Sequence, residues 1–130
     1  MSLSIQRSIM EQFSFEGKNV RSFYVKGIGG CLVASDVCAA IGYSDERSGR
    51  RAIQRHVPEK YQVRYKHVKT EINRRVHVNP PQDDQILLTE AGLNCFLLRC
   101  KMDKADPFME LVCEEVVPRE IRYGLKVQVS

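Results

Sequence analysis

The sequence contains no tryptophan, no CxxC pair and no long apolar run. A membrane span needs roughly 18 consecutive apolar residues, which no stretch approaches, and the N-terminus lacks the hydrophobic core of a signal peptide. The cysteines are odd in number and lie in apolar surroundings, which predicts reduced thiols in a reducing compartment. They are Cys31, Cys38, Cys95, Cys100 and Cys113. We therefore expect a soluble intracellular protein with no membrane partner.

The sequence also lacks the residue groupings of enzymes and metal sites. Its histidines, His56, His67 and His77, pair with no other residue at metal-ligand spacing. The GIGG run at 27–30 is not followed by the GK[ST] of a phosphate-binding loop, so we interpret it as a turn. A Cys/His hydrolase needs a thiol beside an imidazole, but here the histidines and the cysteines lie in different segments. We expect no enzymatic activity, no metal, no cofactor and no small-molecule substrate.

Positive charge is concentrated in the middle of the chain. The net charge of the 130 residues is only +4. Residues 44–79, however, contain ten Lys/Arg and four acidic residues, whereas the remainder contains ten and twelve. This distribution predicts a positive surface on one side of the molecule. A solvated charged face with no ligand is the alternative interpretation.

The stretch from 32 to 57 predicts two short helices around a turn. Ser35 is positioned to cap the first helix, and Gly42 can end it in a left-handed conformation. Ser44 or Asp45 can cap the second helix, whose inner side carries Ala52 and Ile53. The second helix is basic: Arg47, Arg51 and Arg55 share one face at i, i+4 and i+8, and Arg50 flanks them. The pattern is typical of a helix-turn-helix unit, although many such units bind no nucleic acid.

The elements around this helix pair predict an α+β fold. Phe13–Phe15, Val20–Val25 and Cys31–Ala34 favour a three-stranded antiparallel β-meander, separated by turns. After Pro58, alternation at Tyr61–Val68 and again at Arg74–Val78 predicts a basic β-ribbon or long loop.

Two helices are expected to complete the core. A short strand at Ile86–Leu88 precedes a helix capped by Thr89, and Asp106 caps the last helix. The expected core residues are Phe15, Val33, Val37, Ile41, Ile53, Leu93, Phe96, Leu97, Phe108, Val112 and Val116.

Four blocks of the sequence resemble the N-terminal domain of the BRO proteins. These are the products of the baculovirus repeated open reading frames, and their domain also occurs in other large DNA viruses and in phage antirepressors. The blocks are VASDVCAAIGY, a helix ending in HV, LLTEAGLNCFLLRC and DPFMELVCEEVVPREIRYG, in the family's order. The resemblance implies an α+β, nucleic-acid-binding domain at 13–124, after an extension at 1–12 and before a tail at 125–130. The chain departs from the family at 109–112, which is acidic here instead of aromatic and basic.

The leading hypothesis is a non-enzymatic DNA-binding module, regulatory in a viral or phage-like context, in the nucleus or cytoplasm of a host cell. Arginines would neutralise phosphates and release counterions; RNA is an alternative target. The predicted contact residues are Arg47, Arg50, Arg51, Arg55, Arg64, Lys66, Lys69, Arg74 and Arg75. Arg99 and Lys101 are expected to lie away from this surface. The alternative function is a protein-interaction or self-association module, like an antirepressor, which would include a homodimer.

Overall fold

The computed structural model describes residues 11–71 and 79–112 and begins with the predicted meander. Strands β1 (Glu11–Phe15), β2 (Lys18–Val25) and β3 (Gly29–Val33) pair in antiparallel fashion in sequence order. A tight turn at Glu16-Gly17, both with positive φ, joins β1 to β2, so that Phe15 lies opposite Lys18. The β-branched and aromatic content of these segments favours strands, and the prediction of an antiparallel meander is confirmed.

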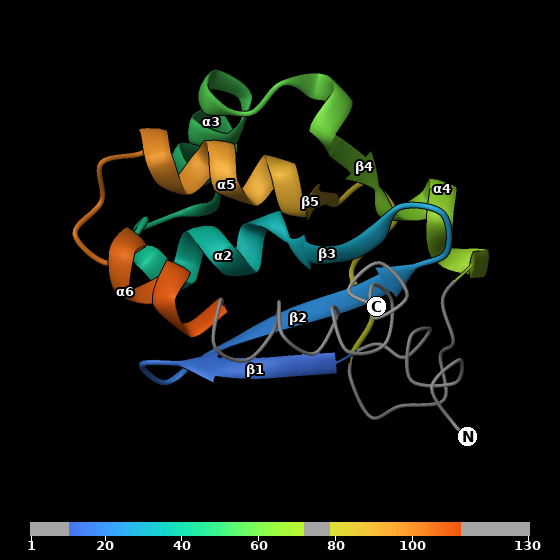
Figure 1. The fold of residues 1–130 in the computed structure, drawn as a ribbon, viewed down its shortest axis with the longest axis horizontal. Helices are drawn as coiled ribbons and strands as arrows, with labels where there is room; N and C mark the ends of the chain where they lie inside the picture. The colour runs from blue at the N-terminus through green and yellow to red at the C-terminus, as the bar shows by residue number, and fades with distance from the viewer. Residues whose placement is uncertain (1–10, 72–78, 113–130) are drawn as a thin grey trace, which may run out of the picture.

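The sheet gains two further strands from the middle of the chain. Its order is β1-β2-β3-β5-β4, in which β5 (Ile86–Thr89) pairs with β3 and β4 (Gln62–Arg64) lies at the edge. Both of these pairings are antiparallel. The strand predicted at Ile86–Leu88 is therefore confirmed, as is the α+β class of the fold. Figure 1 shows the sheet with its covering helices.

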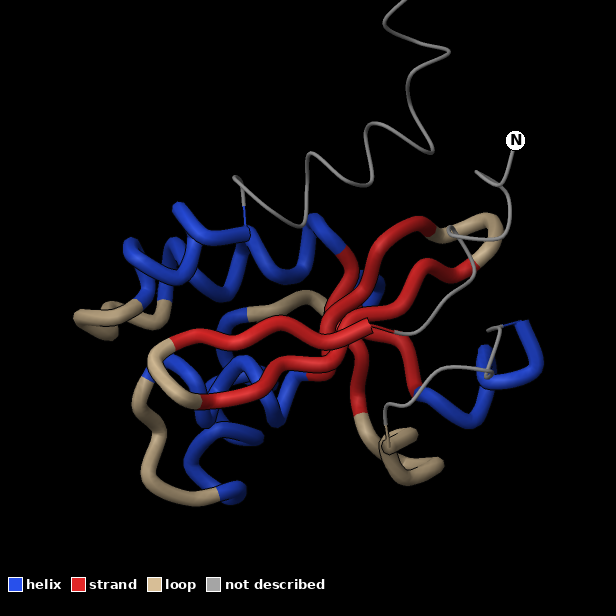
Figure 2. The backbone as a smooth tube through the Cα atoms, turned by 90° about the horizontal axis from the view of Figure 1, so that it is seen from below, coloured by secondary structure: helices blue, strands red, loops and turns tan. Residues whose placement is uncertain are grey.

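Helices of different size cover the two faces of the sheet (Figure 1). On one face lie α2 (Ala34–Ile41), α3 (Glu46–His56), α5 (Glu90–Arg99) and α6 (Ala105–Leu111), and on the other lies the short α4 (Tyr65–Val68). Successive strand residues point to opposite faces, so Leu32 and Leu88 join the larger core while Val33 and Leu87 join the smaller one. Figure 2 shows the strongly twisted strands between these helices.

The larger core contains most of the residues predicted to be buried. Phe96 and Phe108 are fully inaccessible, and the ring of Phe108 meets that of Phe15 edge-on at a centroid distance of 5.2 Å. Every predicted core residue among those described is buried, and Val116 lies outside the described residues. The apolar stripes of the helices are therefore core faces, as their spacing indicated.

The ribbon or long loop predicted at Tyr61–Val68 is wrong for most of that range. Only β4 is extended there, and it is followed by α4 and by a 3₁₀ turn at Lys69–Glu71; a second 3₁₀ turn, Glu59–Tyr61, precedes β4. Tyr65 and Val68, three residues apart, both enter the smaller core, where Tyr65 lies 5.8 Å from the ring of Phe23. Burial at i and i+3 suits a helix, not a strand. The predicted strand at 74–78 lies outside the described residues.

Two predicted helix caps are also wrong. Helix α2 begins at Ala34, directly after β3, so Ser35 is already helical; its hydroxyl instead accepts a hydrogen bond from the Gln85 carboxamide at 3.3 Å. Helix α6 begins at the buried Ala105, which places Asp106 inside its first turn. In both cases the residue before the predicted cap is buried and already helical, so the helix begins earlier in the chain than predicted. The cap predicted at Thr89 is confirmed, because its hydroxyl accepts from the Gly92 N–H.

A half-buried ion pair fixes the start of α2 against the sheet. The Arg21 guanidinium on β2 donates to both carboxylate oxygens of Asp36, at 2.8 and 3.0 Å, and to the carbonyl oxygen of Asn79 at 3.1 Å. A bidentate arginine–carboxylate pair restricts geometry more strongly than a single contact. Arg21 therefore connects the sheet, α2 and the start of the second described segment. None of the described helices has the length and apolar character needed to cross a membrane.

Candidate nucleic-acid interface

The start of α3 is fixed by the turn that precedes it. Gly42 ends α2 in a left-handed conformation, with φ of 114°, as its position in the sequence indicated. The Asp45 carboxylate then accepts a hydrogen bond from the Ser48 N–H at 2.7 Å, which confirms Asp45 as the cap. That hydrogen bond stabilises the ionised carboxylate and lowers the pKa of Asp45. Helix α3 is thus held at its first turn by a charged cap.

The inner face of α3 packs closely on α2. Gly49 is buried, and a Cβ there would lie only 2.8 Å from the Cβ of Cys38. The Cys38 thiol contacts the Gly49 carbonyl oxygen at 3.6 Å. Burial, with a smaller contribution from Cys100, raises the pKa of Cys38 to about 12, so this thiol stays protonated and can donate. Ala52 and Ile53 are also buried, so packing of the inner face holds α3 in place and sets the direction of its outer face.

The outer face of α3 carries exposed arginines that form no ion pair with the other described residues. Arg47, Arg51 and Arg55 are exposed, and none of them belongs to an ion pair among residues 11–71 and 79–112. Arg50 lies 3.6 Å from Glu46, but both side chains are about 70% exposed, so this pair contributes little. The structure therefore brings together all four arginines that the sequence places on this helix.

One cation on this surface was missed by sequence reasoning. The Arg99 guanidinium, at the end of α5, donates to the carbonyl oxygen of His56 at 3.2 Å. Arg99 was expected to lie away from the basic surface, and that expectation is wrong, because α5 packs against α3 with their C-terminal ends together. No local pattern predicts this contact. Partial burial, and then the charges of Arg55 and Arg99, lower the pKa of His56.

Among the predicted basic residues after α3, those that the structure describes do not lie on the same face as the α3 arginines. Arg64 lies across a groove from Arg50 and donates to the Asp84 carbonyl oxygen at 3.1 Å. Lys69 forms an ion pair with Asp83 at 3.0 Å, and Lys66 is exposed on α4. Figures 1 and 2 place α4 towards the opposite end of the sheet from α3. Arg74 and Arg75 lie outside the described residues.

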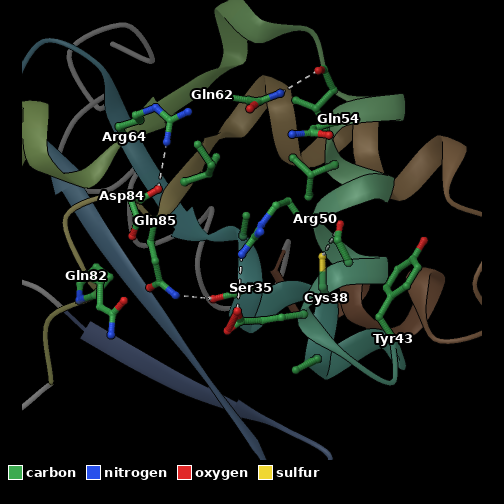
Figure 3. Close-up of a pocket in the computed structure, with 18 of the residues that line it drawn as sticks. Ser35, Cys38, Tyr43, Arg50, Gln54, Gln62, Arg64, Gln82, Asp84 and Gln85 are labelled. Carbon is green, nitrogen blue, oxygen red and sulfur yellow. Dashed lines mark hydrogen bonds and ion pairs between the residues drawn. The ribbon is translucent and has the colours of Figure 1, made fainter.

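An open polar groove runs beside α3, with a volume of about 1050 Å³ (Figure 3). Its banks are α2 and α3 on one side and β4 with residues 80–86 on the other. Carboxamides are prominent in its lining: Gln54, Gln62, Gln82 and Gln85. Its charged residues are three arginines and four carboxylates, so the lining has no excess of positive charge to attract phosphates. The positive charge lies on the outer face of α3 and towards Arg99.

The described residues form no cluster that could hold a metal ion. No cluster of three or more His, Cys, Asp or Glu side chains is placed to hold a metal within 11–71 and 79–112. Cys38, Cys95 and Cys100 carry free thiols. What the site offers is a row of exposed guanidinium groups that form no ion pair within the described part of the chain, a chemistry suited to binding polyanions.

Comparison with known proteins gives a family match and a fold match. The family model described as the N-terminal domain of the BRO family matches residues 20–118. The N-terminal domain of Orf22, a Cydia pomonella granulovirus envelope protein, has a similar fold, with a TM-score of 0.57 and 13% sequence identity. That alignment covers 85% of this chain and 96% of the granulovirus domain. Comparison with curated protein sequences gives no match.

Proposed function

Because this chain belongs to the BRO family through its N-terminal domain, we propose that it is a non-enzymatic module that binds duplex DNA through the outer face of α3. The observation that carries the proposal is the row of arginines at 47, 51 and 55, exposed and without ion-pair partners in the described structure. An unpaired surface arginine contributes little to folding, but it can neutralise a phosphate and release a counterion.

The shape of α3 favours duplex DNA over duplex RNA as the ligand. A helix fits into the major groove of B-form DNA, which is about 12 Å wide. The major groove of A-form RNA is too narrow and deep for side chains to read. Helix α3 presents a continuous exposed face from Arg47 to Arg55. In the family's setting, such a module would act in viral gene regulation.

Fluorescence-anisotropy titrations at several salt concentrations test this function. We expect the wild-type protein to bind duplex DNA more tightly than duplex RNA, with an affinity that falls as salt rises. The double variant Arg51→Ala/Arg55→Ala should reduce the slope of log affinity against log salt by about 0.9 for each phosphate that is no longer neutralised. Its melting temperature should stay close to that of the wild type.

A matched control removes the same charge elsewhere. Lys18 and Lys26 are exposed in the β1–β2 and β2–β3 hairpins, away from α3. The variant Lys18→Ala/Lys26→Ala should leave the salt slope within error of the wild type. If the two double variants weaken binding equally, net charge alone explains the affinity and the outer face of α3 is not the interface.

A second candidate function is a protein-interaction module, favoured by the groove beside α3. Its lining is rich in carboxamides and nearly balanced in charge, and β4 on its bank is an edge strand of the sheet. An edge strand can pair with another chain, including a second copy. Sedimentation experiments distinguish the two functions: a concentration-dependent dimer that duplex DNA does not alter, together with no salt-dependent DNA binding, would favour this second function.

A further inference from the structure

The outer face of α3 carries one uncharged hydrogen-bonding side chain among its arginines. Arg47, Arg50, Arg51 and Gln54 follow each other at i, i+3, i+4 and i+7, so they form a single stripe along the helix. All four are exposed, and the stripe lies opposite the buried Gly49, Ala52 and Ile53. This assigns Arg50 to the central stripe and leaves Arg55 beside it.

This spacing is the one that a helix uses when it lies along a DNA major groove. In a homeodomain, the recognition helix reads bases from positions at the same i, i+3, i+4 and i+7 spacing. The side chains within such a stripe differ in chemistry. Arginine contacts phosphates or guanine, whereas a glutamine carboxamide pairs with the N6 amino group and N7 of adenine and has no charge with which to attract phosphate.

The carboxamide of Gln54 is available for such a contact. It forms no hydrogen bond within the described segments, unlike Gln62, whose amide donates to the Val57 carbonyl oxygen at 2.9 Å. Figure 3 shows Gln54 extending from α3 at the rim of the groove, on the same helix as Arg50. A free donor and acceptor pair thus lies where the outer face of α3 meets the groove, one turn after Arg50 and Arg51.

We propose that Gln54 determines sequence specificity by reading an adenine in the major groove, while the neighbouring arginines supply most of the affinity. This proposal rests on duplex DNA binding by α3. The proposal assigns sequence specificity and affinity to different side chains, so mutations can test the two properties independently. Removing the carboxamide eliminates a base contact without removing charge, so specificity should change while the salt dependence should not.

Selection from a randomised duplex library, followed by quantitative binding, tests the role of Gln54. The wild-type protein should select a motif containing an adenine. Gln54→Ala should lose the preference at that base pair by about 5- to 150-fold, the discrimination expected of one bidentate contact. Its affinity for unrelated duplex DNA and its salt slope should match those of the wild type.

Gln82→Ala is the matched control, because Gln82 is also an exposed carboxamide on the groove but lies on the opposite bank. It should retain the wild-type motif. If the wild-type protein binds duplex DNA without selecting any sequence, or if Gln54→Ala selects the wild-type motif unchanged, the assignment of Gln54 is wrong and the proposed function stands. If the wild-type protein does not bind duplex DNA at all, both proposals fail.

Discussion

The two faces of α3 differ in what their residues contact. The inner face approaches α2 so closely that only glycine fits at position 49, and its Ile53 side chain is buried in the core. The outer face leaves Arg47, Arg51 and Arg55 without an ion-pair partner among the described residues. Mutations on the inner face should therefore change stability, and mutations on the outer face should change binding. The difference lets structure and function be separated within one helix of 11 residues.

The largest expected effect is a loss of stability when a buried residue that packs near the end of α3 is truncated. Phe96 is fully buried, and its ring lies 6.1 Å from Tyr43 and 6.5 Å from His56, below the end of α3. Phe96→Ala should lower the free energy of unfolding by about 3–5 kcal/mol, measured by chemical denaturation, because a cavity replaces the ring. Leu98→Ala, two residues along the same helix and 79% exposed, should cost less than about 0.5 kcal/mol. Equal decreases in the two variants would show that Phe96 does not support α3.

A smaller decrease in stability is expected from Gly49→Ala. The added methyl group would overlap Cys38, where the gap of 2.8 Å is set by the backbones of two packed helices. Overpacking of this kind costs about 1–3 kcal/mol. Thermal and chemical unfolding should both detect it, and DNA binding should weaken as α3 shifts from α2. Arg50→Ala, at the next position on the exposed side, should unfold like the wild type; a Gly49→Ala variant of unchanged stability would mean that α2 and α3 are not tightly packed.

Much of the fold was predictable because its signals are local. Strand composition, Gly42 and the cap residue Asp45 each act within a few residues, and the structure has them where the sequence indicated. Helix α4 was not predictable, because the alternating pattern of its sequence suits a strand equally well. Its helical form depends on Tyr65 and Val68 entering a core formed by β2 and β3, far away in sequence.

The candidate site was predictable only along α3 itself. Helical spacing was enough to group its arginines. Whether Arg64 or Lys69 would be paired depended on the path of residues 83–84, which no local pattern fixes. The position of Arg99 likewise depends on how α5 packs on α3, and the role proposed for Gln54 depends on knowing which side of the helix is buried.

A further prediction is that Arg99, at the end of α5, contributes to DNA binding together with the outer face of α3. Arg99→Ala should reduce the salt slope for duplex DNA by up to about 0.9, because its guanidinium lies at the end of α3 beside His56. Removing its hydrogen bond to a carbonyl oxygen on the exposed surface should have little effect on the melting temperature. Lys101→Ala provides the comparison, since Lys101 is exposed beyond the helix. The same slope in both variants and in the wild type would limit the interface to α3.

The smallest effect is expected at the other end of the sheet. Lys66→Ala/Lys69→Ala removes two cations on α4 and the turn after it, one of which is already paired with Asp83. Titrations with duplex DNA should give a salt slope close to that of the wild type. A decrease similar to that of Arg51→Ala/Arg55→Ala would show that the ligand reaches α4, and the contrast between the two basic segments would then disappear.

The strand order has a consequence for how the chain folds during synthesis. Because β3 pairs with β5 and not with β4, the partner of Cys31 is Thr89, which is synthesised much later. Contacts between residues distant in sequence form slowly, and a growing chain exposes its N-terminal part first. Helices α2 and α3 therefore leave the ribosome before β5 and Phe96 exist to hold them. We expect a nascent chain to acquire an ordered arginine face only once α5 has been made.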